Sequence, residues 1–158
     1  MQTVSQLRKV LQIVPGRLAG LRDESVDRKP DSSHWSPKEE LGHLLDSAVN
    51  NHQRIVRAQM EDNLALPGYE QNRWVAIHDY QQRDWQELIS LWHAINRQLL
   101  AAAESVPHSA WSHKLRVGNS ESMTLEFVFD DYLAHMVHHL KHIGIELDDI
   151  QVGAWKAA

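Results

Sequence analysis

The chain has 158 residues, which is long enough for one domain with its own hydrophobic core. It contains no cysteine, so disulfides, zinc–thiolate sites and cysteine nucleophiles are excluded. A transition-metal site therefore has to use imidazole, carboxylate or water. The formal net charge is −5 and the sequence has no basic cluster, which argues against a nucleic-acid partner.

Targeting and membrane signals are not found in the sequence. The amino terminus has no apolar run followed by a small-residue cleavage site, and no apolar stretch reaches the roughly 18 residues that span a bilayer. We therefore expect a cytoplasmic protein with no membrane partner. Because no repeat or linker divides the sequence, residues 1–158 are expected to form a single domain.

The first predicted helix covers residues 2 to 23. Apolar residues recur there at helical spacing from Val4 to Leu21. Pro15 and Gly16 interrupt the pattern, and a proline inside a helix removes a backbone hydrogen bond. We expect a kink or weak point at these two residues.

The second predicted helix has the clearest start in the sequence. Ser36 is a good N-cap, Pro37 suits the first helical position, and Glu39 completes a capping box. The helix should run to about Met60, because a Pro-Gly loop signal follows at positions 67 and 68.

Two more helices complete the prediction. A series of mostly apolar residues from Trp74 to Leu99, which includes His78 and Gln81, recurs in alternating steps of four and three and predicts one continuous helix that ends at Val106-Pro107. A polar stretch follows, with a short irregular or extended segment, and Thr124 can cap a last helix over Leu125 to Glu146. Four amphipathic helices indicate an all-α four-helix bundle.

Residues 135 to 142, "HMVHHLKH", hold four histidines. On a helix they form two interleaved pairs, His135 with His139 and His138 with His142. A helical wheel at about 100° per residue places His139 inside the apolar stripe and His135 on its flank. The other two histidines fall toward solvent. His135 and His139 are therefore the pair that can converge on one ion, with Cβ atoms about 6 Å apart.

His43 is the candidate for a third ligand, since catalytic zinc-type sites have three protein ligands. Asn50 and Arg54 lie on the same side of the predicted second helix and extend a polar strip. An apolar stripe lies opposite, formed by Leu41, Leu44, Leu45, Ala48, Ile55 and Val56. Either that stripe faces a second subunit, or the site is a polar cleft at the edge of the bundle. Spacing alone does not separate metal ligands from ordinary surface or core histidines.

Two blocks resemble a known family. "HWSPKEELGHLLDSAVNNHQRIVRAQ" (34–59) and "TLEFVFDDYLAHMVHHLKHIGIEL" (124–147), with their spacing, are similar to the DinB-like, or DinB/YfiT-like, superfamily. The resemblance implies a four-helix bundle that forms a homodimer. It also implies a divalent metal held by His43, His135 and His139, with Zn²⁺ as first choice and Ni²⁺, Mn²⁺ or Fe²⁺ as alternatives.

The resemblance also suggests the type of chemistry. Characterised relatives include thiol S-transferases and a mycothiol-dependent isomerase, and many members are assigned by inference to metal-dependent hydrolases. A small-molecule substrate and a low-molecular-weight thiol cofactor are thus expected, with Asn50, Arg54 and Tyr132 as candidate contacts. No residue is singled out as catalytic base. The alternative is a non-catalytic metal-binding bundle with a structural or stress-related role.

Overall fold

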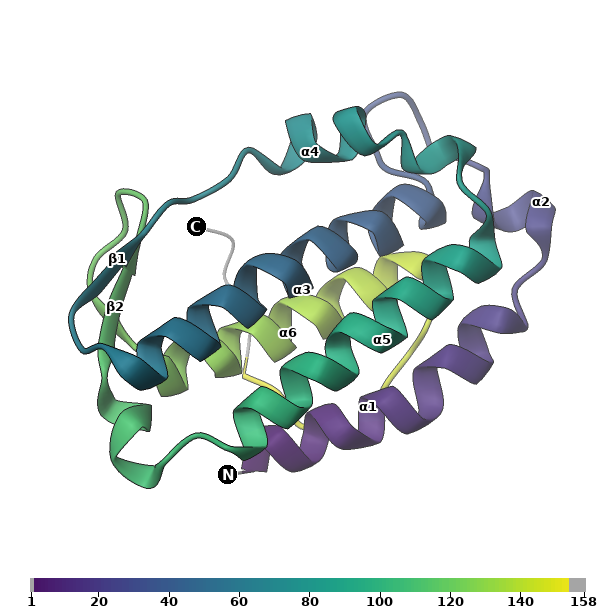
Figure 1. Cartoon of the computed structure of the whole chain (residues 1–158). Coiled ribbons are helices and arrows are strands. Elements are labelled where there is room, and N and C mark those ends of the chain that lie inside the picture. The colour runs from purple at the N-terminus through teal and green to yellow at the C-terminus, as the bar shows by residue number, and fades with distance from the viewer. Residues whose placement is uncertain (1, 154–158) are drawn as a thin grey trace.

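Four long helices run side by side along the length of the molecule (Figure 1). The computed structural model describes residues 2–153. The helices are α1 (Gln2–Ala19), α3 (Pro37–Met60), α5 (Trp85–Glu104) and α6 (Leu125–Ile143). Because α3 and α1 each contact both α5 and α6, the four helices close around one core. The predicted all-α four-helix bundle is confirmed.

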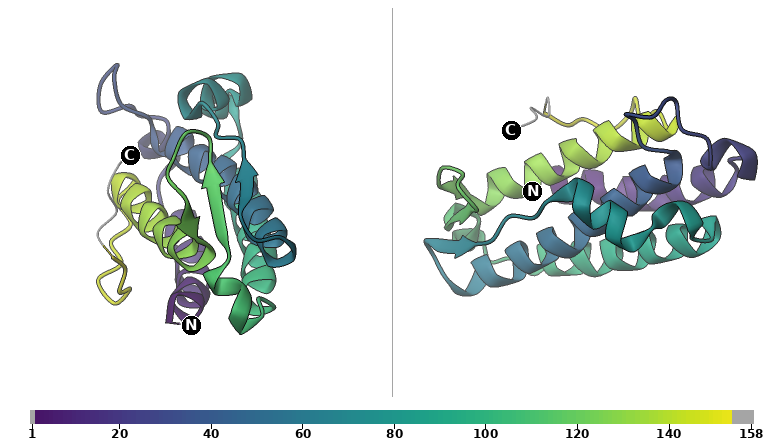
Figure 2. Two further views of the ribbon diagram at one scale, coloured as in Figure 1. Left: turned by 90° about the vertical axis from the view of Figure 1, so that its left-hand side faces the viewer. Right: turned by 90° about the horizontal axis from the view of Figure 1, so that it is seen from above.

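Short elements connect and flank the long helices. They are α2 (Asp23–Val26), α4 (Gln71–His78) and the 3₁₀ turns η1 (Tyr80–Gln82) and η2 (His108–Ser112). α4 lies along the outside of α3 (Figures 1 and 2). None of the helices in residues 2–153 is long and apolar enough to cross a bilayer.

A three-stranded sheet lies at one end of the bundle (Figure 2). β1 (Leu64–Leu66) pairs in parallel with β2 (Lys114–Val117), and β2 pairs in antiparallel with β3 (Met123–Thr124). The extended segment predicted before the last helix corresponds to β2 and β3. The partner strand β1 was not predicted. Its pairing fastens the segment that follows α3 to the segment that precedes α6.

The predicted third helix is wrong as one continuous element. α4 ends at His78, and Asp79 takes a left-handed conformation with φ of 47°. A new helix begins at Trp85, where the side chain of Asp84 accepts a hydrogen bond from the backbone N–H of Glu87. The spacing of four and three residues continues across this break through the polar residues His78 and Gln81, so the spacing alone did not reveal it. The left-handed residue and the new cap create the break.

Two other helix ends differ from the prediction. α1 passes through Pro15 and ends at Ala19, because its fully buried residues Val14 and Leu18 keep packing on both sides of the proline. α6 ends at Ile143 rather than near 146. Gly144 there adopts a left-handed conformation with φ of 95°, and its N–H donates to the carbonyls of the last turn.

Helix α3 is covered by the chain's own elements on both of its faces. In the apolar stripe, Leu41, Leu44, Ala48 and Ile55 are fully buried, and Leu45 and Val56 are half-buried. The interpretation that this stripe faces a second subunit is therefore wrong for its buried members. His43, on the opposite side of the helix, is also fully buried, so the site is not an open cleft at that residue. The homodimer itself stays a prediction.

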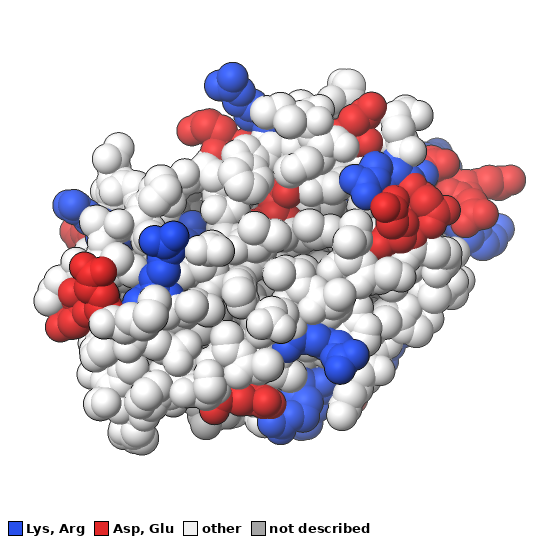
Figure 3. Space-filling view, viewed as in Figure 1, with Lys and Arg blue, Asp and Glu red and all other residues white. Residues whose placement is uncertain are grey.

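Charged side chains are dispersed on the face seen in Figure 3. Lysine and arginine lie singly or beside acidic side chains, and most of the area between them is uncharged (Figure 3). This face offers no continuous basic field to a phosphate backbone. That no nucleic acid is bound stays a prediction.

The contact between Gly42 and Tyr80 supplies a stability test. A methyl group on Gly42 would overlap the Tyr80 ring, whereas one on Gly16 of α1 meets no described atom within 4 Å. Gly42→Ala should lower the free energy of unfolding by about 1–3 kcal/mol through overpacking. Gly16→Ala, the matched control, should raise it by about 0.5–1 kcal/mol through helix propensity. Denaturant titration measures both changes, and equal effects would contradict the close packing at Gly42.

Candidate metal centre

Three histidines from two neighbouring helices meet between α3 and α6. One nitrogen from each of His43, His135 and His139 lies within 4.8 Å of the other two. The Nε2 atoms of His43 and His135 are 3.0 Å apart. Nitrogens bonded to one tetrahedral ion at about 2.0–2.1 Å would be about 3.3–3.4 Å apart, so small side-chain shifts suffice to hold an ion. The structure thus brings together the three residues expected to bind metal.

The two helices that carry the triad have well-defined starts. The hydroxyl of Ser36 accepts the N–H of Glu39, and the Glu39 carboxylate accepts the N–H of Ser36. The hydroxyl of Thr124 accepts the N–H of Phe127. Both predicted caps are present, and they fix where each helix begins. The phase of a helix sets which of its side chains face inward.

Glu40 was missed by the sequence interpretation. Nδ1 of His139 lies 2.6 Å from Oε2 of Glu40, and both side chains are buried. Since an ionised carboxylate only accepts hydrogen bonds, the proton belongs on Nδ1, and Nε2 keeps its lone pair for an ion. A carboxylate one turn before His43 on the same helix was the available signal.

The surroundings of His43 fit a bound ion. Its Nε2 faces another Nε2, and two neutral rings can share only one proton at such a contact. Among residues 2–153, its buried Nδ1 has no hydrogen-bond partner. The ring is held by packing, because Trp35 lies tilted against it with ring centroids 4.9 Å apart. The contact with His135 thus uses one shared proton at Nε2, and an ion shared by the triad would bind at the same nitrogen.

His43 and His135 are also in the protonation state that binds metal. Burial lowers the pKa of His43 to about 3, and the neighbouring His139 acts in the same direction. Burial lowers the pKa of His135 to about 2, assisted by the charges of His139 and His43. Both rings are therefore neutral at pH 7, which is the form that donates a nitrogen lone pair.

A cavity of about 570 Å³ opens beside the triad. His135 lines it, so one of the three candidate ligands faces the space. Further lining comes from α3, the start of α4 and the residue two positions before it, strands β2 and β3 with their connection, and α6: Ser47, Asn51, Arg54, Tyr69, Gln71, Val117, Ser120, Met123, Phe127, Val128, Asp131 and Tyr132. This volume is within the range of small-molecule sites.

Two of the predicted substrate contacts line this cavity. Arg54 does so, and its guanidinium donates to Oδ1 of Asn51 at 3.1 Å. Burial lowers the pKa of Arg54, although arginine stays charged at neutral pH. Tyr132 lines the cavity while its hydroxyl donates to Asn96, and burial raises its pKa. Asn50 is not among the lining residues, because its amide donates to the backbone carbonyl of Asp46.

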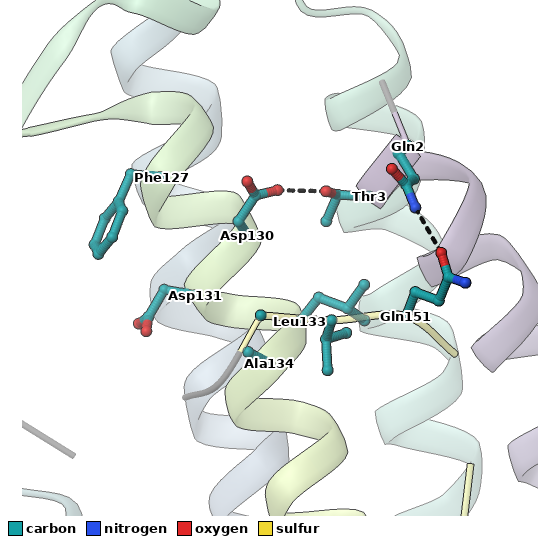
Figure 4. A pocket seen from close by; sticks show the side chains of 10 residues that line it. Gln2, Thr3, Phe127, Asp130, Asp131, Leu133, Ala134 and Gln151 are labelled. Atoms are coloured by element: carbon teal, nitrogen blue, oxygen red, sulfur yellow. Dashed lines mark hydrogen bonds between the residues drawn. The ribbon is translucent and has the colours of Figure 1, made fainter. Parts of the chain in front are cut away.

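A second cavity of about 590 Å³ lies on the far side of Phe127 and Asp131, which line both spaces. Figure 4 shows Thr3 bonded to Asp130 and Gln2 bonded to Gln151 at its edge. None of the three candidate metal ligands is among its lining residues. The cavity that contains His135 is therefore the one linked to the metal centre.

Asp46 anchors the outer layer of the protein to α3. The hydroxyl of Tyr80 donates to Oδ1 of this buried carboxylate at 2.6 Å, and Nδ1 of His78 lies 3.2 Å from the same oxygen. Burial raises the pKa of Asp46. Asp46 does not belong to the converging triad. It holds η1 and the end of α4 against the helix that carries His43.

A four-helix bundle with converging histidines on two adjacent helices defines a class of candidate metal-binding proteins. The chain belongs to the DinB superfamily, whose family model matches residues 6–143. It is 21% identical over 140 residues to a protein of Oceanobacillus iheyensis, covering 89% of this chain and 81% of that one. It is 26% identical over 146 residues to YfiT of Bacillus subtilis, covering 85% and 79%. Both relatives are named, by inference, as metal-dependent hydrolases.

Solved structures show the same fold. The structure of Bacillus subtilis YfiT, described as having an unusual four-helix bundle topology, matches with a TM-score of 0.68 at 20% identity. The match covers 89% of this chain and 87% of that one. A mycothiol-dependent maleylpyruvate isomerase matches with a TM-score of 0.70 at 13% identity, covering 96% of this chain and 60% of that one. At these identities the likeness extends to the fold alone.

The buried histidines should make the metal-free protein sensitive to acid. His43 and His135 would titrate near 6.5 in the unfolded chain, well above their pKa values in the fold. The unfolded chain then binds protons that the folded chain does not, so the free energy of unfolding falls as the pH drops from about 6.5 toward 3. Each histidine contributes a slope of at most about 1.4 kcal/mol per pH unit.

Urea titrations of chelator-treated protein between about pH 4 and pH 7 measure this slope. A double variant, His43→Gln with His135→Gln, should lose most of it. An unchanged slope in the double variant would assign the acid sensitivity to other groups.

Proposed function

We propose that the protein is a divalent-metal-dependent enzyme in which His43, His135 and His139 are the protein ligands. The observation that carries the proposal is the convergence of three imidazoles, two buried and one half-buried, beside a cavity lined by the half-buried Arg54. Zn²⁺ is the first choice, because three histidines with room for a further ligand suit this ion. The substrate is a small molecule, and the reaction is hydrolysis or transfer to a low-molecular-weight thiol.

The protein's residues would have distinct roles in such a site. A divalent ion in this place supplies Lewis-acid chemistry, which makes water or a thiol available as an anion near neutral pH. Glu40 fixes the tautomer and orientation of His139 through its hydrogen bond at Nδ1. Trp35, packed on His43, covers that imidazole with an aromatic ring.

Arg54 gives the cavity a preference for anionic groups. Its charge is among those that lower the pKa of His135, so the guanidinium acts on the metal centre electrostatically. A guanidinium binds a carboxylate through two parallel hydrogen bonds, which fixes the orientation of the substrate as well as its position. We infer that the substrate carries a carboxylate, or a similar anion, at the end that contacts Arg54.

Metal content tests the triad directly. Protein purified without a histidine tag should contain a tightly held divalent ion, measured by elemental analysis against protein concentration. His139→Ala removes one of three ligands and should lose that ion, whereas His108→Ala, at an exposed histidine of η2, should keep it. Absence of stoichiometric metal in the wild type, or unchanged content in His139→Ala, contradicts the proposal.

Activity assays separate the two reaction types. Conjugation of bacterial thiols to electrophiles should be compared with hydrolysis of esters and amides, each with and without metal. For an active substrate that carries a carboxylate, Arg54→Ala should raise KM about 10- to 100-fold, since a hydrogen bond to a charged group contributes about 1.5–3 kcal/mol. Arg57→Ala, at an exposed arginine of α3, is the matched control. Activity that survives complete metal removal would reject both reaction types.

A further inference from the structure

The histidine-rich segment of α6 contains a second pair that the proposed active site does not use. His138 and His142 are one turn apart, and their ring centroids are 4.4 Å apart. The His142 side chain is 46% exposed, and His138 is half-buried. This pair therefore lies beside the buried triad but in contact with solvent.

Glu40 links the second pair to the triad. Its Oε2 lies 2.6 Å from Nδ1 of His139, and its Oε1 lies 3.3 Å from Nδ1 of His142. Ligand atoms of Glu40, His139 and His142 all fall within 4.8 Å of one another. One oxygen of the carboxylate thus faces His139 of the triad, while the other faces the exposed His142.

We propose that Glu40, His138 and His142 form an outer divalent-metal site, distinct from the buried triad. Imidazole and carboxylate are suitable ligands for Zn²⁺, Ni²⁺ and Cu²⁺. Histidines at i and i+4 on a helix have Cβ atoms about 6 Å apart, which lets both rings reach one ion. His139 belongs to the inner site under the proposed function, so the remaining ligand is His138, whose ring lies next to that of His142 and has to turn toward Glu40 to reach the same ion.

The charges around the outer site agree with this assignment. The nearest cation in sequence, Lys141, is exposed and lies 4.0 Å from the carboxylate of Glu146. Glu40, whose side chain is 9% exposed, supplies the negative charge that an ion would neutralise. Because His142 is exposed, its ring can turn toward an ion without repacking the core. The outer ion would therefore exchange with solvent more readily than the buried one.

Titration of untagged, chelator-treated protein with Zn²⁺ alone tests the outer site, with calorimetry reporting the stoichiometry. The wild type should bind two equivalents, of which the weaker is lost in both His138→Ala and His142→Ala. The control His108→Ala should keep both equivalents. Circular dichroism verifies that each variant is folded.

The Zn²⁺ titration distinguishes loss of the inner site from loss of the outer site. His43→Ala should remove the tight equivalent and leave the weaker one, because His43 belongs only to the triad. A single wild-type equivalent that disappears in His142→Ala supports the outer site and contradicts the buried one. A weaker equivalent that survives in both His138→Ala and His142→Ala overturns the outer site, as does its loss in His108→Ala.

Discussion

Three imidazoles, one from α3 and two from α6, pack against one another where the two helices meet, and the rest of the candidate site is arranged around them. Burial in this place disfavours protonation, and each charge would also repel its neighbours. His43 and His135 therefore stay neutral at pH 7. The hydrogen bond between His139 of α6 and Glu40 of α3 joins the two helices that carry the triad, and Trp35 packs on His43.

The long helices and the irregular segments have different roles in the candidate site. The candidate ligands lie on α3 and α6, which pack against each other within the bundle. The cavity wall includes Tyr69, before α4, and the β2–β3 connection. Pairing of β1 with β2 holds these two distant segments together at one end of the bundle. Rigid helices thus fix the proposed ligands, while connections between elements shape the space for a substrate.

The sequence predicted those features that depend on local patterns. The helix cap at Ser36 depends only on residues close to it in the sequence. The helical wheel separated His139 from the exposed His142 because the direction of a side chain around a helix also depends only on its local position. The break at Asp79 was not predicted in this way, since the spacing of four and three residues continues across it through the polar His78 and Gln81. Nor was the role of Glu40, because its partner His139 is 99 residues away and the contact depends on how two helices pack.

X-ray absorption at the edge of the bound metal reports the number and distance of its imidazole ligands and so tests the proposed triad. With one equivalent bound, the wild type should show three imidazole nitrogens at about 2.0–2.1 Å. His43→Ala should remove one of them, and His138→Ala should leave all three in place. Fewer than three imidazoles in the wild type, or a spectrum unaffected by His43→Ala, would contradict a metal centre shared between α3 and α6.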